Sequence, residues 1–182
     1  MSAGAGAAAG GATVAALEAR VAELEARAAE LAAKDGVHEA MVRYMCACDV
    51  PTGKGAAVAA AFTRDGTWEL LDRPDAVAWA ATGTEALVEK FDRNHTRLPF
   101  SIHYLTNGRV QVGADGSTAR GQWYYFEPCT FRGEVPLWTA GHYDNSFAVE
   151  DGVWKLSHLR LRGFFSTRFD RGWVAEPDFD TA

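Results

Sequence analysis

The first part of the chain carries apolar residues at helical spacing. Between residues 14 and 31 they recur at alternating intervals of three and four, with Glu and Arg between them, which is a short heptad seam. Its members are Val14, Leu17, Val21, Leu24, Ala28 and Leu31. Asp35-Gly36 is expected to end this helix. About three heptads gain little from helix propensity alone, so the seam must pack on its own domain or on another subunit.

Three more helices and a strand are expected before Leu98. The apolar spacing of residues 37–49 predicts an amphipathic helix, and shorter helices follow at about 55–63 and 84–95. The TWELL segment is typical of a strand, and residues 72–81 form a loop or a short strand.

Beyond Leu98 the pattern changes to long strands separated by Gly-bearing turns. Strands are expected at 100–113, 117–132, 136–149 and 152–165. The turns ADGS, RGE and EDG between them are hairpin signals, so the strands should form an antiparallel meander. Helices come first and strands after, which predicts an α+β fold: a curved sheet wrapped around helices, with a cavity on its concave face.

This pattern divides the chain into four parts. Residues 1–12 are rich in Ala and Gly and are expected to be disordered. Residues 13–35 form the heptad helix, residues 36–170 form the single domain, and residues 171–182 form a C-terminal tail.

Composition narrows the classes of function. The net charge is −6 and no large Lys/Arg cluster occurs, so a nucleic-acid partner is not expected. Six Trp, five Tyr and ten Phe either fill a core or line an apolar pocket. Three Cys do not suggest a disulfide framework. The N-terminus lacks the basic start of a signal peptide and no apolar run could span a bilayer, so we expect a cytoplasmic protein without a membrane partner.

Asp49 and His103 are the candidate pair for chemistry. Asp49 ends the helical stretch VHEAMVRYMCACD, and His103 lies in the apolar segment PFSIHYLTNGRVQV. A carboxylate that reaches an imidazole fixes its tautomer and raises its basicity, which is enough to move a proton without a cofactor. The alternatives are a core histidine and an Asp that only ends a helix. Asp is unfavourable at a helix C-terminus, which suggests another role.

Four segments resemble one family. They are RYMCACD (43–49), IHYLTNGRVQV (102–112), RGQWYYFEPCTF (120–131) and AGHYDNSFAVEDGVWKLSHLRLRGFF (140–165). Together they are similar to the SnoaL-like branch of the nuclear-transport-factor-2-like superfamily, which includes scytalone dehydratase, bile-acid dehydratases and hexachlorocyclohexane dehydrochlorinase. The resemblance covers roughly residues 14–170 and implies a cone-shaped α+β barrel. It also implies a homo-oligomer, with a trimer favoured and a dimer possible.

The resemblance also implies roles for four residues. His103 would be the general base, and Asp49 would bond the far imidazole nitrogen. Tyr44 would donate a hydrogen bond to a substrate carbonyl or hydroxyl, although a core-facing aromatic is equally consistent with its position. Arg162 would stabilise developing negative charge on oxygen.

Further candidates would contact the substrate. Strand alternation places Trp123, Tyr125 and Glu127 on one face. By resemblance Glu127 falls at or next to an acidic pocket residue and could act as an acid; alternatively it is an exposed charge or a partner of Arg120 or Arg132.

Three other residues are also candidates for substrate contact: Asn107, His142 and Trp138. His142 and Trp138 share a strand face, and an inward face would bring them into the pocket. Asn107 more often closes a turn before Gly108. Asp49, His103, His142 and His158 could in principle hold a metal, but no short-range ligand motif supports one, so neither metal nor cofactor is expected.

The expected function is therefore a cofactor-free lyase. It would be a dehydratase that acts through the Asp-His pair on a hydrophobic, hydroxylated cyclic ketone, steroid-like or polyketide. One alternative is a cyclase or double-bond isomerase in natural-product biosynthesis. Another is a small-molecule-binding module without catalysis.

Overall fold

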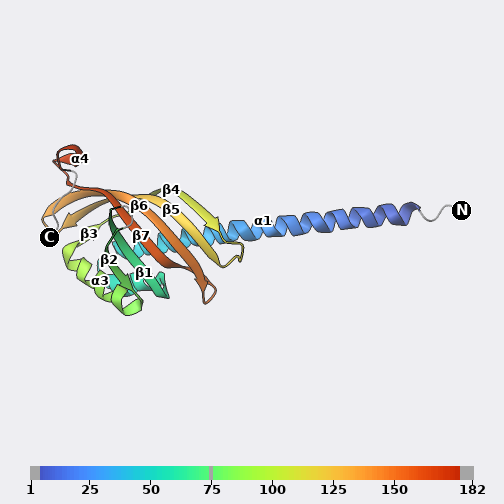
Figure 1. Ribbon diagram of the computed structural model, residues 1–182, viewed down its shortest axis with the longest axis horizontal. Helices are drawn as coiled ribbons and strands as arrows, with labels where there is room; N and C mark the ends of the chain where they lie inside the picture. The colour runs from blue at the N-terminus through green and yellow to red at the C-terminus, as the bar shows by residue number, and fades with distance from the viewer. Residues whose placement is uncertain (1–4, 74–75, 177–182) are drawn as a thin grey trace.

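The computed structural model describes residues 5–73 and 76–176. A curved sheet wraps around helices, and one long helix extends far from this domain (Figure 1). The helices are α1 (Ala5–Asp49), α2 (Lys54–Ala60), α3 (Thr84–Arg97) and α4 (Gly172–Ala175). The strands are β1 (Phe62–Arg73), β2 (Ala76–Thr82), β3 (Phe100–Ser101), β4 (Tyr104–Val112), β5 (Thr118–Phe131), β6 (Val135–Glu150) and β7 (Val153–Arg168).

The sheet confirms the predicted meander. Its order is β2-β1-β7-β6-β5-β3, with β4 also paired to β5, and the pairs from β4 to β7 are antiparallel. β1 and β7 pair in parallel, which brings the early strand back against the end of the meander. The α+β cone expected from the order of helices and strands is therefore the fold of this chain.

Left-handed residues form two of the hairpin turns. Arg132 and Gly133 have φ values of 50° and 74°, and Asp151 and Gly152 have φ values of 53° and 76°. Two consecutive positive φ angles match the right-handed twist of the flanking strands, and Gly adopts the second at little cost. The RGE and EDG signals in the sequence thus correspond to the tight turns that set the register of β5, β6 and β7.

The prediction that Asp35-Gly36 ends the first helix is wrong. α1 continues without interruption to Asp49. A Cβ added at Gly36 would overlap the indole ring of Trp154, so this glycine allows β7 to approach the helix. α1 also begins at Ala5, inside the stretch expected to be disordered, because Ala is the best helix former. Residues 1–4 lie outside the described part of the chain.

The two halves of α1 have different surroundings. Val37, Met41, Tyr44 and Cys48 follow helical spacing and are buried under the sheet. The heptad seam, in contrast, remains exposed and does not pack on its own domain. At the other end of the chain, α4 lies in the predicted C-terminal tail, and residues 177–182 lie outside the described part of the chain.

Candidate active site

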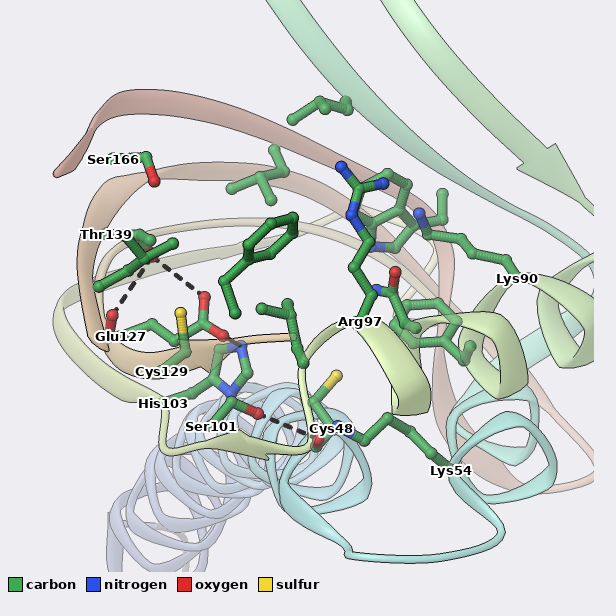
Figure 2. Close-up of a pocket in the computed structure, with 18 of the residues that line it drawn as sticks. Cys48, Lys54, Lys90, Arg97, Ser101, His103, Glu127, Cys129, Thr139 and Ser166 are labelled. Carbon is green, nitrogen blue, oxygen red and sulfur yellow. Dashed lines mark hydrogen bonds and ion pairs between the residues drawn. The ribbon is translucent and has the colours of Figure 1, made fainter. Parts of the chain in front are cut away.

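A cavity of about 270 Å³ lies between the concave face of the sheet and the three helices α1, α2 and α3 (Figure 2). Much of its wall is apolar. Phe91, Leu98, Phe131, Leu137 and Leu161 contribute to that wall. Polar side chains enter it in two groups, one around His103 and one around Lys90. A concave, mostly apolar site with a few convergent polar groups is typical of a small-molecule pocket.

Asp49 holds His103 at two points. The His103 ring Nδ1 lies 2.6 Å from Asp49 Oδ1, and the His103 backbone N–H donates to Asp49 Oδ2 over 3.2 Å. The backbone N–H is available because His103 lies between β3 and β4, not inside one continuous strand as the sequence predicted. With Nδ1–H donated to the carboxylate, the lone pair is on Nε2.

Glu127 lies on the other side of the imidazole. Its Oε1 is 3.5 Å from His103 Nε2, and its Oε2 accepts a hydrogen bond from Thr139 Oγ1 over 3.1 Å. The His103 and Glu127 side chains are only 10% and 12% exposed. Figure 2 shows His103 and Glu127 together on one side of the cavity. The imidazole therefore sits between two carboxylates in a largely dry place.

These neighbours set the pKa of His103. Burial lowers this pKa, and the Lys54 charge also lowers it. The charge of Glu127 and the hydrogen bond and charge of Asp49 raise it, and they outweigh burial, so the pKa of His103 lies above its ordinary value. The site thus stabilises the imidazolium, which is the form that arises when His103 accepts a proton.

Tyr44 lines the cavity and is also part of the core. Its side chain is 2% exposed, and its hydroxyl oxygen accepts a hydrogen bond from Trp68 Nε1 over 2.8 Å. Burial raises the pKa of Tyr44 well above its ordinary value. The phenol therefore stays protonated and keeps a proton that it can donate.

Trp123 and Tyr125 share the inward face with Glu127, as predicted, but they fill the core and do not line the cavity. Trp123 packs edge-on against Phe147, and Tyr125 packs on Tyr143 with ring centroids 5.1 Å apart.

Arg162, His142 and Trp138 do not line the cavity. The β5–β6 register pairs Glu127 with Thr139, so Thr139 points inward and its neighbour Trp138 points outward. The same alternation places His142 on the outer face, and Arg162 is its partner across β6 and β7. The expectation that these three contact substrate is therefore corrected: they belong to the other side of the sheet.

Asn107 is exposed and lies at an irregularity of β4. Its φ is 55°, and the β4–β5 register shifts between Thr106 and Arg109. This is a turn-forming position within a strand, which agrees with the alternative considered for Asn107.

The sequence reasoning missed several cavity residues. Lys54 comes from the start of α2, and Ser101 and Thr139 surround the Asp49–His103–Glu127 cluster. Lys90, Asn94 and Arg97 also line the cavity from α3. Their spacing of four and three residues places them on one helix face, and this polar stripe was the available signal.

No group of three or more metal-ligating side chains gathers within the described residues. His158 pairs instead with Glu69 on the neighbouring strand, at 2.8 Å from Nε2 to Oε2. The set of Asp49, His103, His142 and His158 is thus not brought together. No helix in the described part of the chain is both long and apolar enough to cross a membrane.

The α+β cone encloses an apolar cavity in which a buried histidine lies between two carboxylates, and known proteins share this fold. The SnoaL-like domain matches residues 29–160, so the chain belongs to the SnoaL-like family. No curated protein matches the sequence.

Solved structures share this fold at low sequence identity. A scytalone dehydratase-like protein of Novosphingobium aromaticivorans is 18% identical with a TM-score of 0.68, covering 79% of this chain and 91% of its own. A type 2 hexachlorocyclohexane dehydrochlorinase is 19% identical with a TM-score of 0.68, covering 79% and 93%. A Mycobacterium tuberculosis protein of unknown function is 21% identical with a TM-score of 0.61, covering 78% and 76%. These similarities establish the nuclear-transport-factor-2-like fold.

Proposed function

We propose that this protein is a cofactor-free lyase, a dehydratase of hydrophobic, hydroxylated cyclic ketones. The observation that carries the proposal is the position of His103. Its Nδ1 is held by Asp49, and its Nε2 lies beside Glu127 at the wall of an apolar cavity. This arrangement suits removal of a proton from carbon, because it positions a base and stabilises its charged product.

The reaction would proceed in two steps. His103 Nε2 takes the proton from the carbon next to the carbonyl, and the electron pair of the broken C–H bond forms an enolate. The C–O bond of the β-hydroxyl then breaks as the carbon–carbon double bond forms. The leaving hydroxyl takes the proton from the imidazolium and departs as water, so His103 returns to its starting state.

Two neighbours would support these steps. Asp49 keeps the imidazole oriented and stabilises its positive charge, as the Asp of a hydrolytic triad does. Tyr44 can donate a hydrogen bond to the enolate oxygen, since its own hydroxyl oxygen already accepts one from Trp68. General acid–base catalysis of this kind contributes about 10²–10⁴-fold in rate, and positioning in the dry cavity contributes further.

The cavity favours compact substrates. Its volume of about 270 Å³ lies just below the usual range for ligand pockets, roughly 300–1,000 Å³. Two or three fused rings of polyketide type therefore fit the proposal better than a complete steroid.

A cyclase or double-bond isomerase is the second candidate function. The closeness of His103 Nε2 and Glu127 supports it, because a proton shared between the two groups can return to a different carbon. The first step is the same proton removal, and only the fate of the enolate differs.

Incubation with a panel of hydroxylated cyclic ketones tests the proposal. Mass spectrometry would detect the loss of one water for a dehydratase and an unchanged mass for an isomerase. His103→Ala and Asp49→Asn should each lower turnover by at least about 100-fold without changing the circular-dichroism spectrum. Thermal stabilisation by panel members without any product would instead indicate a binding module, and near wild-type turnover in either variant would reject the Asp49–His103 mechanism.

A further inference from the structure

The cavity is acidic at one end and basic at the other. Asp49 and Glu127 flank His103, whereas Lys90 and Arg97 lie across the cavity from Glu127 (Figure 2). Lys54 enters from α2 toward Cys48, and its side chain is also part of the wall. The proposed proton chemistry uses only the acidic end.

The four lysines of the chain divide into two pairs. Lys34 and Lys155 each form an ion pair with a glutamate, at 2.6 Å and 2.9 Å. Lys54 and Lys90 line the cavity and have no such carboxylate partner within the described residues. The lysines that reach the cavity are thus the ones left without a protein counter-ion.

Lys90 is held in place by aromatic rings. Its Nζ lies 3.7 Å from the ring centroids of both Trp68 and Trp79, and these cation–π contacts fix the ammonium without neutralising its charge. Burial, followed by the nearby charge of Arg97, lowers the pKa of Lys90 to about 8. An anion bound next to Lys90 Nζ would offset the free-energy cost of burying this positive charge.

Lys54 is the more buried of the two cavity lysines, with only 5% of its surface exposed. A buried charge is unfavourable unless it is paired. Arg97 places a second positive group near Lys90, with its guanidinium packed 5.6 Å from the Phe131 ring centroid. The charge of Lys90, together with that of Arg97, attracts negative charge from the ligand at this end of the cavity.

We propose that the basic end binds an anionic group of the substrate, a carboxylate, while the reacting carbon faces His103. The orientation toward His103 rests on the function proposed above. The substrate class then narrows to compact, hydroxylated cyclic ketones that also carry a carboxylate, with a ring against Trp68 and the carboxylate at Lys90 and Arg97. Binding of the anion itself does not depend on the chemistry at His103.

Calorimetry with 2-naphthoate and its neutral isostere 2-naphthamide tests the proposal. We expect 2-naphthoate to bind the wild-type protein at least about tenfold more tightly, a difference of about 1.4 kcal/mol. Lys90→Met should remove this preference and retain naphthamide binding, because Met fits between the two indoles. Lys34→Met, on the exposed part of α1, is the matched control and should keep the preference.

Equal affinity of the wild-type protein for the two probes, absence of naphthoate binding, or an unchanged preference in Lys90→Met would overturn the proposal. The His103→Ala variant separates this proposal from the lyase. If that variant keeps the naphthoate preference while no ketone is turned over by the wild type, the anion site stands and the proton chemistry fails.

A second inference concerns the exposed half of α1. Val14, Leu17, Val21, Leu24 and Leu31 are 48–65% exposed, and the helix that carries them extends away from the domain (Figure 1). The seam has Val, Val and Ala at its a positions and Leu at every d position. A β-branched residue at a with Leu at d favours a parallel two-stranded coiled coil.

The flanking charges favour the same arrangement. Glu18 and Glu25 occupy e positions, and Arg20 and Arg27 occupy g positions. In a parallel pair, Arg20 lies opposite Glu25 of the second copy, whereas an antiparallel pair brings like charges together. Arg20 also contacts Glu23 within its own helix, an exposed pair that contributes little. We infer that the seam pairs in parallel with the seam of a second copy of this chain.

Light scattering in solution tests this pairing. The wild type should be a dimer, and Leu17→Glu with Leu24→Glu should reduce it to a monomer without changing the domain's circular dichroism. Ala19→Glu with Ala26→Glu, on the opposite face of the helix, is the control and should leave the dimer intact. A monomeric or trimeric wild type, or a dimer that survives the Leu→Glu changes, would overturn the inference.

A crosslink tests the orientation. Val14→Cys, in a Cys46→Ser background, should form a disulfide between chains because equivalent a positions meet in a parallel pair. A dimer that does not crosslink under oxidising conditions would reject the parallel arrangement.

Discussion

His103 and His142 lie on opposite sides of the sheet, and their pKa values are shifted in opposite directions. His103 faces the cavity between Asp49 and Glu127, and its pKa is raised. Burial lowers the pKa of His142 on the outer face; the Arg162 charge lowers it further, and the effect outweighs that of Asp144.

The difference between the two histidines follows from the side of the sheet on which each lies. A residue that points inward meets carboxylates and the cavity, and its neighbour in sequence meets the aromatic outer face. The ring centroids of His142 and Tyr124, for example, are 5.2 Å apart, and His142 does not line the cavity. The face, and not the residue type, therefore decides which histidine can act as a base. The predictions that follow compare the two faces with matched variants.

The largest expected effect is on turnover. His103→Ala should lower kcat/KM by about 10²–10⁴-fold, because it removes the proposed general base. His142→Ala should leave kcat/KM near the wild-type value, because this residue does not reach the cavity. Steady-state kinetics on the ketone identified by the panel would measure both. Equal losses in the two variants would show that activity depends on sheet integrity and not on the face.

The next effect is on stability, at two glycines that pair across β6 and β7. A Cβ at Gly141 would overlap the Arg162 carbonyl oxygen and the Tyr125 ring, whereas a Cβ at Gly163 meets nothing within 4 Å. Gly141→Ala should lower the free energy of unfolding by about 1–3 kcal/mol through overpacking. Gly163→Ala should raise it by about 0.4–1 kcal/mol by restricting the unfolded chain. Urea denaturation would measure both, and similar destabilisation by both changes would contradict the packing seen around the two glycines.

A smaller effect is expected in the pH dependence of kcat/KM. The base must be neutral, so kcat/KM should rise as His103 loses its proton, with a limb above the ordinary histidine pKa of about 6.5. Glu127→Gln removes a charge that raises the pKa of His103, so this limb should move to lower pH. Asp144→Asn, beside His142, is the control and should leave it in place. An unchanged limb in Glu127→Gln would mean that Glu127 does not tune the base.

The smallest expected effect is on the pKa of His142, on the outer face of the sheet. Arg162→Met removes a positive charge that lowers the pKa of His142, so that pKa should rise. Turnover should not change. Histidine titration by NMR would measure the shift in the pKa of His142. A loss of turnover in Arg162→Met would show that Arg162 takes part in the reaction.

The sequence predicted most of the fold because its local signals were strong. Gly-bearing turns delimited β5, β6 and β7, and helical spacing identified the buried half of α1. The break at Gly36 was predicted wrongly because glycine also serves close packing. Gly36 lies against Trp154, more than a hundred residues away in the sequence. The residues near Gly36 in the sequence therefore give no sign of this contact.

The candidate site was predicted in part. Asp49 and His103 were found because each stood out in its own segment, and Glu127 followed from alternation along one strand. Arg162 was a candidate by resemblance alone. Trp138 and His142 were candidates only if their face pointed inward, and alternation within a strand does not say which face is inward. That choice depends on the pairing of Glu127 with Thr139, which only the register of two strands supplies.

The central claim is that His103 removes protons from carbon without a cofactor. Hydrogen exchange at the carbons next to the carbonyl of 2-tetralone, measured in D₂O by NMR, tests it without the natural substrate. After thermal stabilisation shows that tetralone binds, the wild type should accelerate deuterium incorporation, and His103→Ala should not. Tetralone that binds the wild type without faster exchange, or equal acceleration by His103→Ala, would contradict the account.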